Sequence, residues 1–375
     1  MAMTVREIDR DEHLSFVTER AATASVSFLQ CPSWAQVKSE WGAQSLGWHD
    51  GGGSLVGVGL VLLRQVPKVK RFLAYLPEGP VIDWSAADLE EWLRPMVGHL
   101  REAGAFGVRM GPPVVSRRWT AATIKAAIAG GAGGRLGDVP PDETDPVADS
   151  VSATLTRLGW RAPAGDEGFS TGQPRYVFQV PVHGRTGDEV LAGFNQLWRR
   201  NVKKAAKAGV EVTQGTEADL PAFHQLYLET AARDHFTGRP LAYFQRMWSA
   251  MRAEDPDRIR LYLAHHEGDL VAATTMVRVG RHAWYSYGAS STAKRDVRGS
   301  NAVQWQMLRE AAESGAAVYD LRGITDTLAE DDPHFGLIQF KLGTGGEAVE
   351  YLGEWDLPLN RLLFKAFEVY MDRRG

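Results

Sequence analysis

The sequence contains one cysteine, Cys31, among 375 residues. A lone cysteine excludes an intrachain disulfide and is typical of proteins kept in a reducing cytoplasm. The longest apolar run, Leu55 to Leu63, is about half as long as the roughly 20 residues that span a bilayer. The first residues include an acidic side chain and lack the apolar core of a signal peptide. The sequence therefore predicts a soluble cytoplasmic protein without a transmembrane segment.

The chain also lacks basic excess, metal-binding motifs and a recognisable nucleophile. Its formal net charge is −4, so any contact with RNA must come from a local basic patch. The ten histidines show neither His-Glu-x-x-His spacing nor a Cys-His cluster, so no metal site is predicted. No strand-turn-helix nucleophile elbow is predicted, so no serine suited to covalent catalysis is expected.

A strand-strand-helix-strand pattern occurs twice in the chain. A protein of this length is expected to form two domains, and the repeat predicts an internal duplication. The first copy has strands at 54–64, 71–76 and 106–110 with a helix at 89–103. The second has strands at 269–279, 283–289 and 317–321 with a helix at 302–314.

The most distinctive stretch runs from Val318 to Pro358. A short apolar strand ends in the turn Arg322-Gly323, and an acidic loop follows at residues 330–333. Residues 336–342 are expected to form a second strand, with Lys341 in an aromatic and aliphatic context. A lysine in such a place commonly lays its stem on apolar surface and reaches water with its ammonium group.

The order of these motifs resembles the C-terminal pattern of the Fem family, aminoacyl-tRNA-dependent transferases that build peptidoglycan cross-bridges. Leu321 stands where the family usually has an aromatic residue. The residues that carry the match are Asp320, Gly323, Gly336, Phe340, Lys341, Gly353, Asp356 and Pro358.

The resemblance implies an α/β (α+β) fold of two acetyltransferase-like subdomains, with mixed sheets flanked by helices. Residues 1–170 and 353–375 would form the first subdomain, in which the glycine- and proline-rich composition of 129–149 predicts a flexible surface insertion. Residues 171–352 would form the second, which carries the Phe-Lys motif. The long coiled-coil arm of some relatives is not expected, because Gly209 ends the preceding helix promptly.

The resemblance also assigns roles in binding and catalysis. A helix at 32–41, with Ser33 as a possible N-terminal cap, would present a lysine to the diphosphate of a uridine-diphosphate-linked muropeptide. Alternatively, Lys38 is simply exposed on an amphipathic helix, Arg239 lies at the start of a helix, and the tyrosines are packed in the core. The substrate-binding set is Lys38, Arg239, Tyr243, Tyr285 (chosen over Tyr287) and Glu354, and the catalytic set is Lys341 with Phe340.

A basic stripe at Arg199, Lys203 and Lys207 lies on one face of a helix expected within 188–208. It either contacts the phosphate backbone of a transfer RNA or is a solvated helix face. The segment 295–302 does not fit the pyrophosphate loop of an acetyltransferase, so no coenzyme A and no other cofactor is predicted.

The predicted function is transfer of an amino acid, glycine, from aminoacyl-tRNA to the diamino acid of a peptidoglycan precursor. The acceptor would be UDP-MurNAc-pentapeptide or its lipid-linked form, the latter implying peripheral contact with the inner membrane face. The alternatives are a tRNA-dependent enzyme acting on a small peptide or antibiotic intermediate, and a catalytically inactive binding protein of the same fold.

Overall fold

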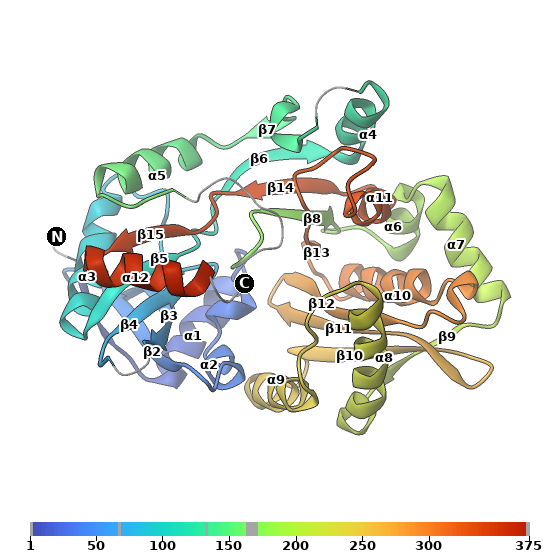
Figure 1. Ribbon diagram of the computed structural model, residues 1–375, viewed down its shortest axis with the longest axis horizontal. Helices are drawn as coiled ribbons and strands as arrows, with labels where there is room; N and C mark the ends of the chain where they lie inside the picture. The colour runs from blue at the N-terminus through green and yellow to red at the C-terminus, as the bar shows by residue number, and fades with distance from the viewer. Residues whose placement is uncertain (1–2, 67–68, 132–133, 163–171, 373–375) are drawn as a thin grey trace.

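The computed structural model describes residues 3–66, 69–131, 134–162 and 172–372, which form two mixed α/β halves side by side (Figure 1). The subdomain boundary predicted between residues 170 and 171 lies outside the described residues. The first sheet has the order β1-β2-β3-β4-β5-β15. Its strands are β1 (Thr4–Glu7), β2 (Gly42–His49), β3 (Leu55–Gln65), β4 (Phe72–Leu76), β5 (Ala105–Met110) and β15 (Trp355–Pro358).

The second sheet has the order β7-β6-β14-β8-β13-β12-β11-β10-β9. Its strands are β6 (Val115–Thr120), β7 (Glu143–Thr144), β8 (Tyr176–Pro181), β9 (Glu211–Gly215), β10 (Ile259–His266), β11 (Asp269–Val279), β12 (His282–Ser290), β13 (Val318–Gly323) and β14 (Glu347–Tyr351). The chain therefore crosses between the halves more often than the sequence suggests. Strands β6 and β7 join the second sheet although they fall within residues 1–170, whereas β15 returns to the first sheet as expected.

The internal duplication is confirmed and is longer than predicted. The order β1-α1-α2-β2-β3-β4-α3-β5 recurs as β9-α8-α9-β10-β11-β12-α10-β13. In both copies the helix connects two parallel neighbouring strands, β4 with β5 and β12 with β13. The helices are α1 (Arg10–Ala21), α2 (Ser33–Val37), α3 (Leu89–Glu102), α8 (Leu220–Arg233), α9 (Leu241–Glu254) and α10 (Gly299–Glu313).

The remaining helices lie outside the repeat. They are α4 (Ala121–Ala129), α5 (Pro146–Arg157), α6 (Gly187–Gly193), α7 (Gln196–Lys207), α11 (Phe335–Leu342) and α12 (Arg361–Asp372). Helix α12 packs on β5, where Phe364 and Phe367 meet Phe106 at ring-centroid distances of 6.3 and 5.5 Å. In the described part of the chain the longest helix, α10, has 15 residues, and no helix combines the length and apolarity needed to cross a membrane.

Several expected elements differ in the structure. Residues 336–342 are not a strand but belong to α11, which buries Ile338, Lys341 and Leu342 at helical spacing. The helix expected at 32–41 ends at Val37, and the single helix expected within 188–208 is two helices, α6 and α7. The segment 129–149 is not a flexible insertion in its described part, because Leu136 and Val139 are buried in the hydrophobic core of the second half.

The two halves share a hydrophobic core at the interface of α2 with α9. Ser33 is not an N-terminal cap there. Its backbone N–H and its hydroxyl both donate to the carboxylate of Glu254 on α9, each at 2.6 Å. Arg258 lies 3.8 Å from the same carboxylate. A buried acidic group therefore ties the first half to the second, beside the segment that carries Lys38.

Candidate active site between the two halves

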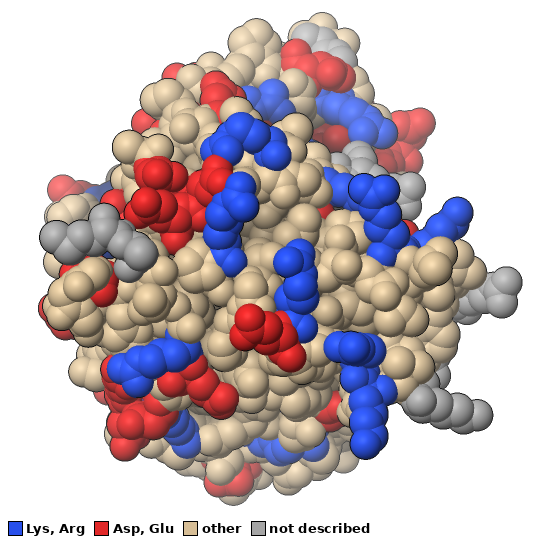
Figure 2. Space-filling model, turned by 90° about the vertical axis from the view of Figure 1, so that its left-hand side faces the viewer, with Lys and Arg blue, Asp and Glu red and all other residues tan. Residues whose placement is uncertain are grey.

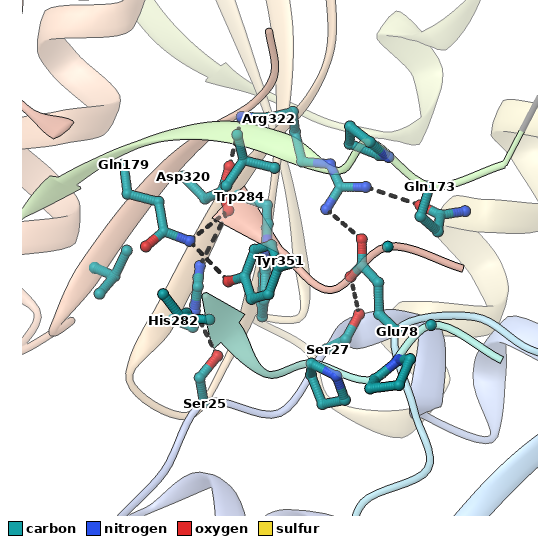
Figure 3. A pocket seen from close by; sticks show the side chains of 18 of the residues that line it. Ser25, Ser27, Glu78, Gln173, Gln179, His282, Trp284, Asp320, Arg322 and Tyr351 are labelled. Carbon is teal, nitrogen blue, oxygen red and sulfur yellow. Dashed lines mark hydrogen bonds and ion pairs between the residues drawn. The ribbon is translucent and has the colours of Figure 1, made fainter. Parts of the chain in front are cut away.

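A cavity of about 180 Å³ opens between the two halves. It is bounded by the loop after α1, the turn after β4 and the ends of β8, β12, β13 and β14. Figure 3 labels ten of the lining side chains, which come from these separate segments. The charged and polar lining residues are Ser25, Ser27, Glu78, Arg118, Gln173, Gln179, His282, Asp320, Arg322, Tyr351 and Glu354.

Asp320 on β13 is the most deeply placed acid of the cavity, with 2% of its surface exposed. Its carboxylate accepts hydrogen bonds from Gln179 Nε2 at 3.0 Å and from the backbone N–H of Arg322 at 2.5 Å. Burial alone would raise the pKa of Asp320, but contacts with His282, Arg322 and Gln179 outweigh burial and hold it below its ordinary value. The cavity therefore has a fixed negative charge at its base.

Arg322 connects the halves at the rim of the cavity. Its backbone is left-handed (φ 62°). The guanidinium donates to Glu78 of the first half at 2.9 Å and to the side chain of Gln173 at 3.0 Å. Glu78 also accepts from the Ser27 hydroxyl at 2.5 Å. This network fixes the relative position of the two halves around the cavity (Figure 3).

Glu354, predicted to bind substrate, lies in the same cavity. Its carboxyl accepts from the Tyr75 hydroxyl in a short hydrogen bond and from the Gln173 backbone N–H at 3.2 Å. Burial raises the pKa of Glu354, while Tyr75 and Arg109 act in the opposite direction.

Lys341 lies outside the residues that line the cavity. Its ammonium donates to the carbonyl oxygens of Arg322 at 3.1 Å and Gly323 at 2.5 Å. Burial lowers the pKa of Lys341 to about 7; Asp320 partly counteracts this shift. The expected half-buried lysine is thus wholly buried behind β13, where it supports the turn at Arg322.

Phe340 turns toward α7 rather than toward the cavity. Its ring lies 4.7 Å from that of Trp198, and its carbonyl oxygen accepts from Trp198 Nε1 at 2.8 Å. A Cβ atom on Gly343 would lie 1.9 Å from the Trp198 ring, so this close packing requires a glycine at the end of α11.

Lys38, Arg239 and Tyr243 do come together, at the interface of α2 with α9. The Lys38 ammonium and the Arg239 guanidinium lie 5.9 and 5.4 Å from the centre of the Tyr243 ring. Burial and the nearby Arg239 both lower the pKa of Lys38. Two cations from different halves thus converge on one aromatic ring, an arrangement suited to a bound dianionic group.

Tyr287, not Tyr285, completes this cluster. The hydroxyl groups of Tyr287 and Tyr243 lie 2.9 Å apart, whereas Tyr285 packs against the core on the other side of the sheet. The reason is a β-bulge: Tyr287 pairs with Thr275 and Tyr285 pairs with Met276, leaving Ser286 unpaired. The extra residue reverses the alternation of side chains along β12.

The cation cluster and the cavity are linked by aromatic contacts. Lys38 lies 5.7 Å from the Trp34 ring, and Phe28 contacts Trp34 and Trp284 at 5.4 and 5.3 Å. Trp284 stacks on His282 at 4.0 Å with an interplanar angle of 4°. Both sites therefore belong to one continuous region between the halves.

The three cations of the basic stripe on α7 differ in their surroundings. Arg199 donates to the carbonyl oxygens of Ala192 and Phe194, each at 2.9 Å, so it stabilises the end of α6. Lys203 and Lys207 are exposed. On the face of the first half, acidic and basic side chains are interspersed over mostly uncharged surface (Figure 2), so that face offers no continuous basic patch.

Sequence reasoning missed most of the polar lining of the cavity. Ser25 and His282 meet although 257 positions separate them, and no local pattern marks either residue. The C-terminal motif contains three residues of the lining and could identify them from the sequence: Asp320, Gly353 and Glu354.

The two duplicated halves with a cavity between them define a tandem acetyltransferase-like fold. The chain belongs to the FemAB family, whose model matches residues 8–267 and 260–371. This confirms the family and the fold that the C-terminal motif indicates.

The similar proteins cover nearly the whole chain. A lipid II:glycine glycyltransferase of Staphylococcus haemolyticus is 24% identical, over 98% of this chain and 95% of its own length. The protein of the same name from Staphylococcus aureus (strain MRSA252) is also 24% identical over the same shares. The crystal structure of FemX matches with a TM-score of 0.80 and 23% identity, over 97% of this chain and 99% of FemX.

Proposed function

We propose that this protein transfers glycine from glycyl-tRNA to the side-chain amine of the diamino acid in a peptidoglycan precursor. The observation that carries the proposal is the convergence of Lys38 and Arg239 on Tyr243 in a chain that matches the FemAB family along its length. The glycyl donor is supported by relatives named lipid II:glycine glycyltransferase.

The acceptor would bind between the halves through two of its parts. Its diphosphate would bind the two cations, since lysine and arginine donate charge-assisted hydrogen bonds to phosphate oxygens. Its amine would enter the cavity, where Asp320 and Glu354 supply carboxyl groups. The names of the relatives favour a lipid-linked acceptor, which would bring the protein to the inner membrane face; the UDP-linked precursor shares the same diphosphate chemistry.

The donor would approach from the second half. An aminoacyl ester is already activated, so the protein has to supply proximity, orientation and stabilisation of developing charge. Exposed Lys203 and Lys207 on α7 would contact the tRNA backbone, and the reaction would take place in the cytoplasm, where aminoacyl-tRNA is made. Oxyanion stabilisation by Lys341 would require its ammonium to leave two carbonyl oxygens, so we assign Lys341 the role of positioning the Arg322 turn.

Transfer of radiolabelled glycine tests the proposal. The protein is incubated with labelled glycyl-tRNA and, in separate reactions, with UDP-MurNAc-pentapeptide and with the lipid-linked precursor. Label is expected on at least one acceptor, and Lys38→Met or Arg239→Met should raise the KM for it about tenfold, the effect of roughly one charged hydrogen bond.

Lys125→Met provides the matched control, because Lys125 is exposed on α4 and outside both sites. Its KM should equal that of the wild type. Failure to label either acceptor with any of a panel of charged tRNAs would overturn the proposed function. Label found only on small peptides would move the assignment to a different acceptor.

A further inference from the structure

Three side chains from separate segments form a chain of contacts at the wall of the cavity. Ser25 Oγ lies 2.6 Å from Nδ1 of His282, and Nε2 of His282 lies 3.6 Å from Oδ2 of Asp320. Ser25 belongs to the first half, and the other two stand on the adjacent strands β12 and β13. Figure 3 shows the imidazole between the hydroxyl and the carboxylate.

Two buried groups joined to one exposed hydroxyl are an arrangement that suits proton transfer. His282 and Asp320 are 4% and 2% exposed, and the imidazole is held flat against Trp284. Ser25 is exposed and lines the cavity. Nε2 of His282 is buried without a hydrogen bond in the described structure, and Asp320 is the carboxylate that faces it. This favours the tautomer with hydrogen on Nε2, which leaves Nδ1 to accept from the Ser25 hydroxyl.

We propose that Ser25 and His282, with Asp320 behind them, relay the proton that the acceptor amine loses as the peptide bond forms. The proposal rests on the proposed function and deepens it by naming the groups that move the proton. Ser25 would touch the amine, His282 would hold the proton, and Asp320 would orient the ring and stabilise its cation.

The step balances without a further reactant. The amine nitrogen bonds to the ester carbonyl carbon, and its proton passes to Ser25 Oγ while the Ser25 proton passes to His282 Nδ1. As the bond between that carbon and the ribose oxygen breaks, the same path returns one proton to the departing oxygen. The products are an amide and the free 3′ end of the tRNA, and the relay ends neutral.

The other charged or titratable groups that line the cavity are committed elsewhere. Arg322 pairs with Glu78 at 2.9 Å, and Arg118 pairs with Glu347. Glu354 and Tyr75 bind each other, and Tyr351 accepts from Gln179 at 3.0 Å. In the described structure, His282 differs from these groups because its hydrogen bond is to the exposed hydroxyl of Ser25.

The first half provides a matched control. His13 Nδ1 lies 2.8 Å from Ser45 Oγ, and His13 is as buried as His282. This pair does not line the cavity, and no carboxylate pairs with His13 in the described part of the chain. Substitutions there reproduce the loss of a buried His–Ser contact without touching the relay.

The test measures kcat with saturating acceptor between about pH 5.5 and 8 for His282→Gln, Ser25→Ala, His13→Gln and Ser45→Ala. Loss of a general base typically costs about 10²–10⁴-fold, so His282→Gln should lower kcat at least 100-fold with little change in KM. The dependence of its kcat on pH should also differ from that of the wild type, because the imidazole no longer takes up the proton. Ser25→Ala should lower kcat about tenfold, and the His13 and Ser45 variants should retain wild-type kcat.

The relay is overturned if wild type transfers glycine and His282→Gln keeps its kcat and pH profile, or if His13→Gln loses as much. If His282→Gln does not fold, the exposed Ser25→Ala decides: unchanged kcat contradicts the relay. Absence of transfer by the wild-type protein overturns the proposed function as well, so the two failures are distinct. Imidazole added to His282→Ala should restore part of the rate, which a purely structural role would not produce.

Discussion

The two halves repeat one order of elements but end their parallel strand pairs differently. In the first half, β4 and β5 stay paired from Phe72 with Ala105 to Leu76 with Met110. In the second half, β12 and β13 pair only over residues 282–284 and 318–320, and β12 then continues alone on that side to Ser290. The second pair therefore opens, and Asp320 stands where it opens.

The two strand pairs also differ in what lies next to them. The closed pair of the first half is extended by β15, which pairs with β5 and in which Asp356 forms a bidentate contact with Arg109 at 2.7 Å. The open pair of the second half instead faces the cavity with Asp320 and His282. Duplication supplied two similar strand pairs, and the two buried groups of the proposed relay, His282 and Asp320, stand on the open one.

The largest expected effect concerns the buried lysine behind the open pair. Folded Lys341 releases its proton near pH 7, whereas an unfolded lysine does so near 10.5. The unfolded state therefore binds more protons between these values, so the free energy of unfolding rises with pH across this window, by up to about 1.4 kcal/mol per pH unit. Urea unfolding of wild type and Lys341→Met should differ by this slope.

Lys125→Met is again the control, and its unfolding curve should keep the wild-type slope. Equal pH slopes for wild type and Lys341→Met would mean that the lysine is not buried as a shifted group. Below pH 7 the buried Lys341 ammonium is charged, which is costly. Lys341→Met removes this cost but also leaves two carbonyl oxygens unpaired. The decisive quantity is therefore the slope of the free energy of unfolding against pH, not the stability at one pH.

The second prediction compares one carboxylate from each half. Asp320→Asn should lower kcat about 100-fold, because a neutral amide no longer stabilises the cationic His282. Asp356→Asn should leave kcat unchanged and lower the free energy of unfolding by about 1–3 kcal/mol, through loss of the charged contact with Arg109. Single-turnover rates and urea midpoints measure both. Equal losses of kcat would contradict the division between the halves.

A smaller effect separates the two tyrosines of β12. Tyr287→Phe removes the hydroxyl that meets Tyr243 and should raise the KM for the UDP-linked acceptor about fivefold, the effect of roughly one neutral hydrogen bond. Tyr285→Phe should leave this KM unchanged, because Tyr285 faces the other core. The opposite ranking in steady-state kinetics would place the substrate on the other side of the sheet.

The smallest effect distinguishes cations on α7. The double variant Lys203→Ala/Lys207→Ala should raise the KM for glycyl-tRNA a fewfold and reduce its dependence on salt, as expected for backbone phosphate contacts. Arg199→Ala should mainly lower the free energy of unfolding, by about 1 kcal/mol, because it loses hydrogen bonds to two carbonyl oxygens. Unchanged salt dependence in the double variant would remove α7 from the tRNA surface.

The sequence predicted the repeat and the C-terminal motif because both are local or periodic. Strand and helix signals repeat at 54–110 and 269–321, and the structure confirms this duplication. The acid Glu354 and the cations Lys38 and Arg239 were found through motif resemblance, and the structure brings the two cations together on Tyr243.

The errors arose where tertiary packing decides. Residues 336–342 carry strand-forming side chains, yet burial of Ile338, Lys341 and Leu342 on one side makes them helical. The bulge in β12 exchanges the roles of Tyr285 and Tyr287, and β2 (Gly42–His49), for which no strand was predicted, pairs with strands of the first sheet. The Ser25–His282 contact joins two halves and could not be found from either segment alone.

A crystal structure with bound UDP-MurNAc-pentapeptide tests the central claim, that both halves bind the acceptor and the open strand pair receives its amine. The account predicts the diphosphate between Lys38 and Arg239 and the amine nitrogen in the cavity, within hydrogen-bonding distance of Ser25. An amine bound on the first half, away from β12 and β13, would contradict it.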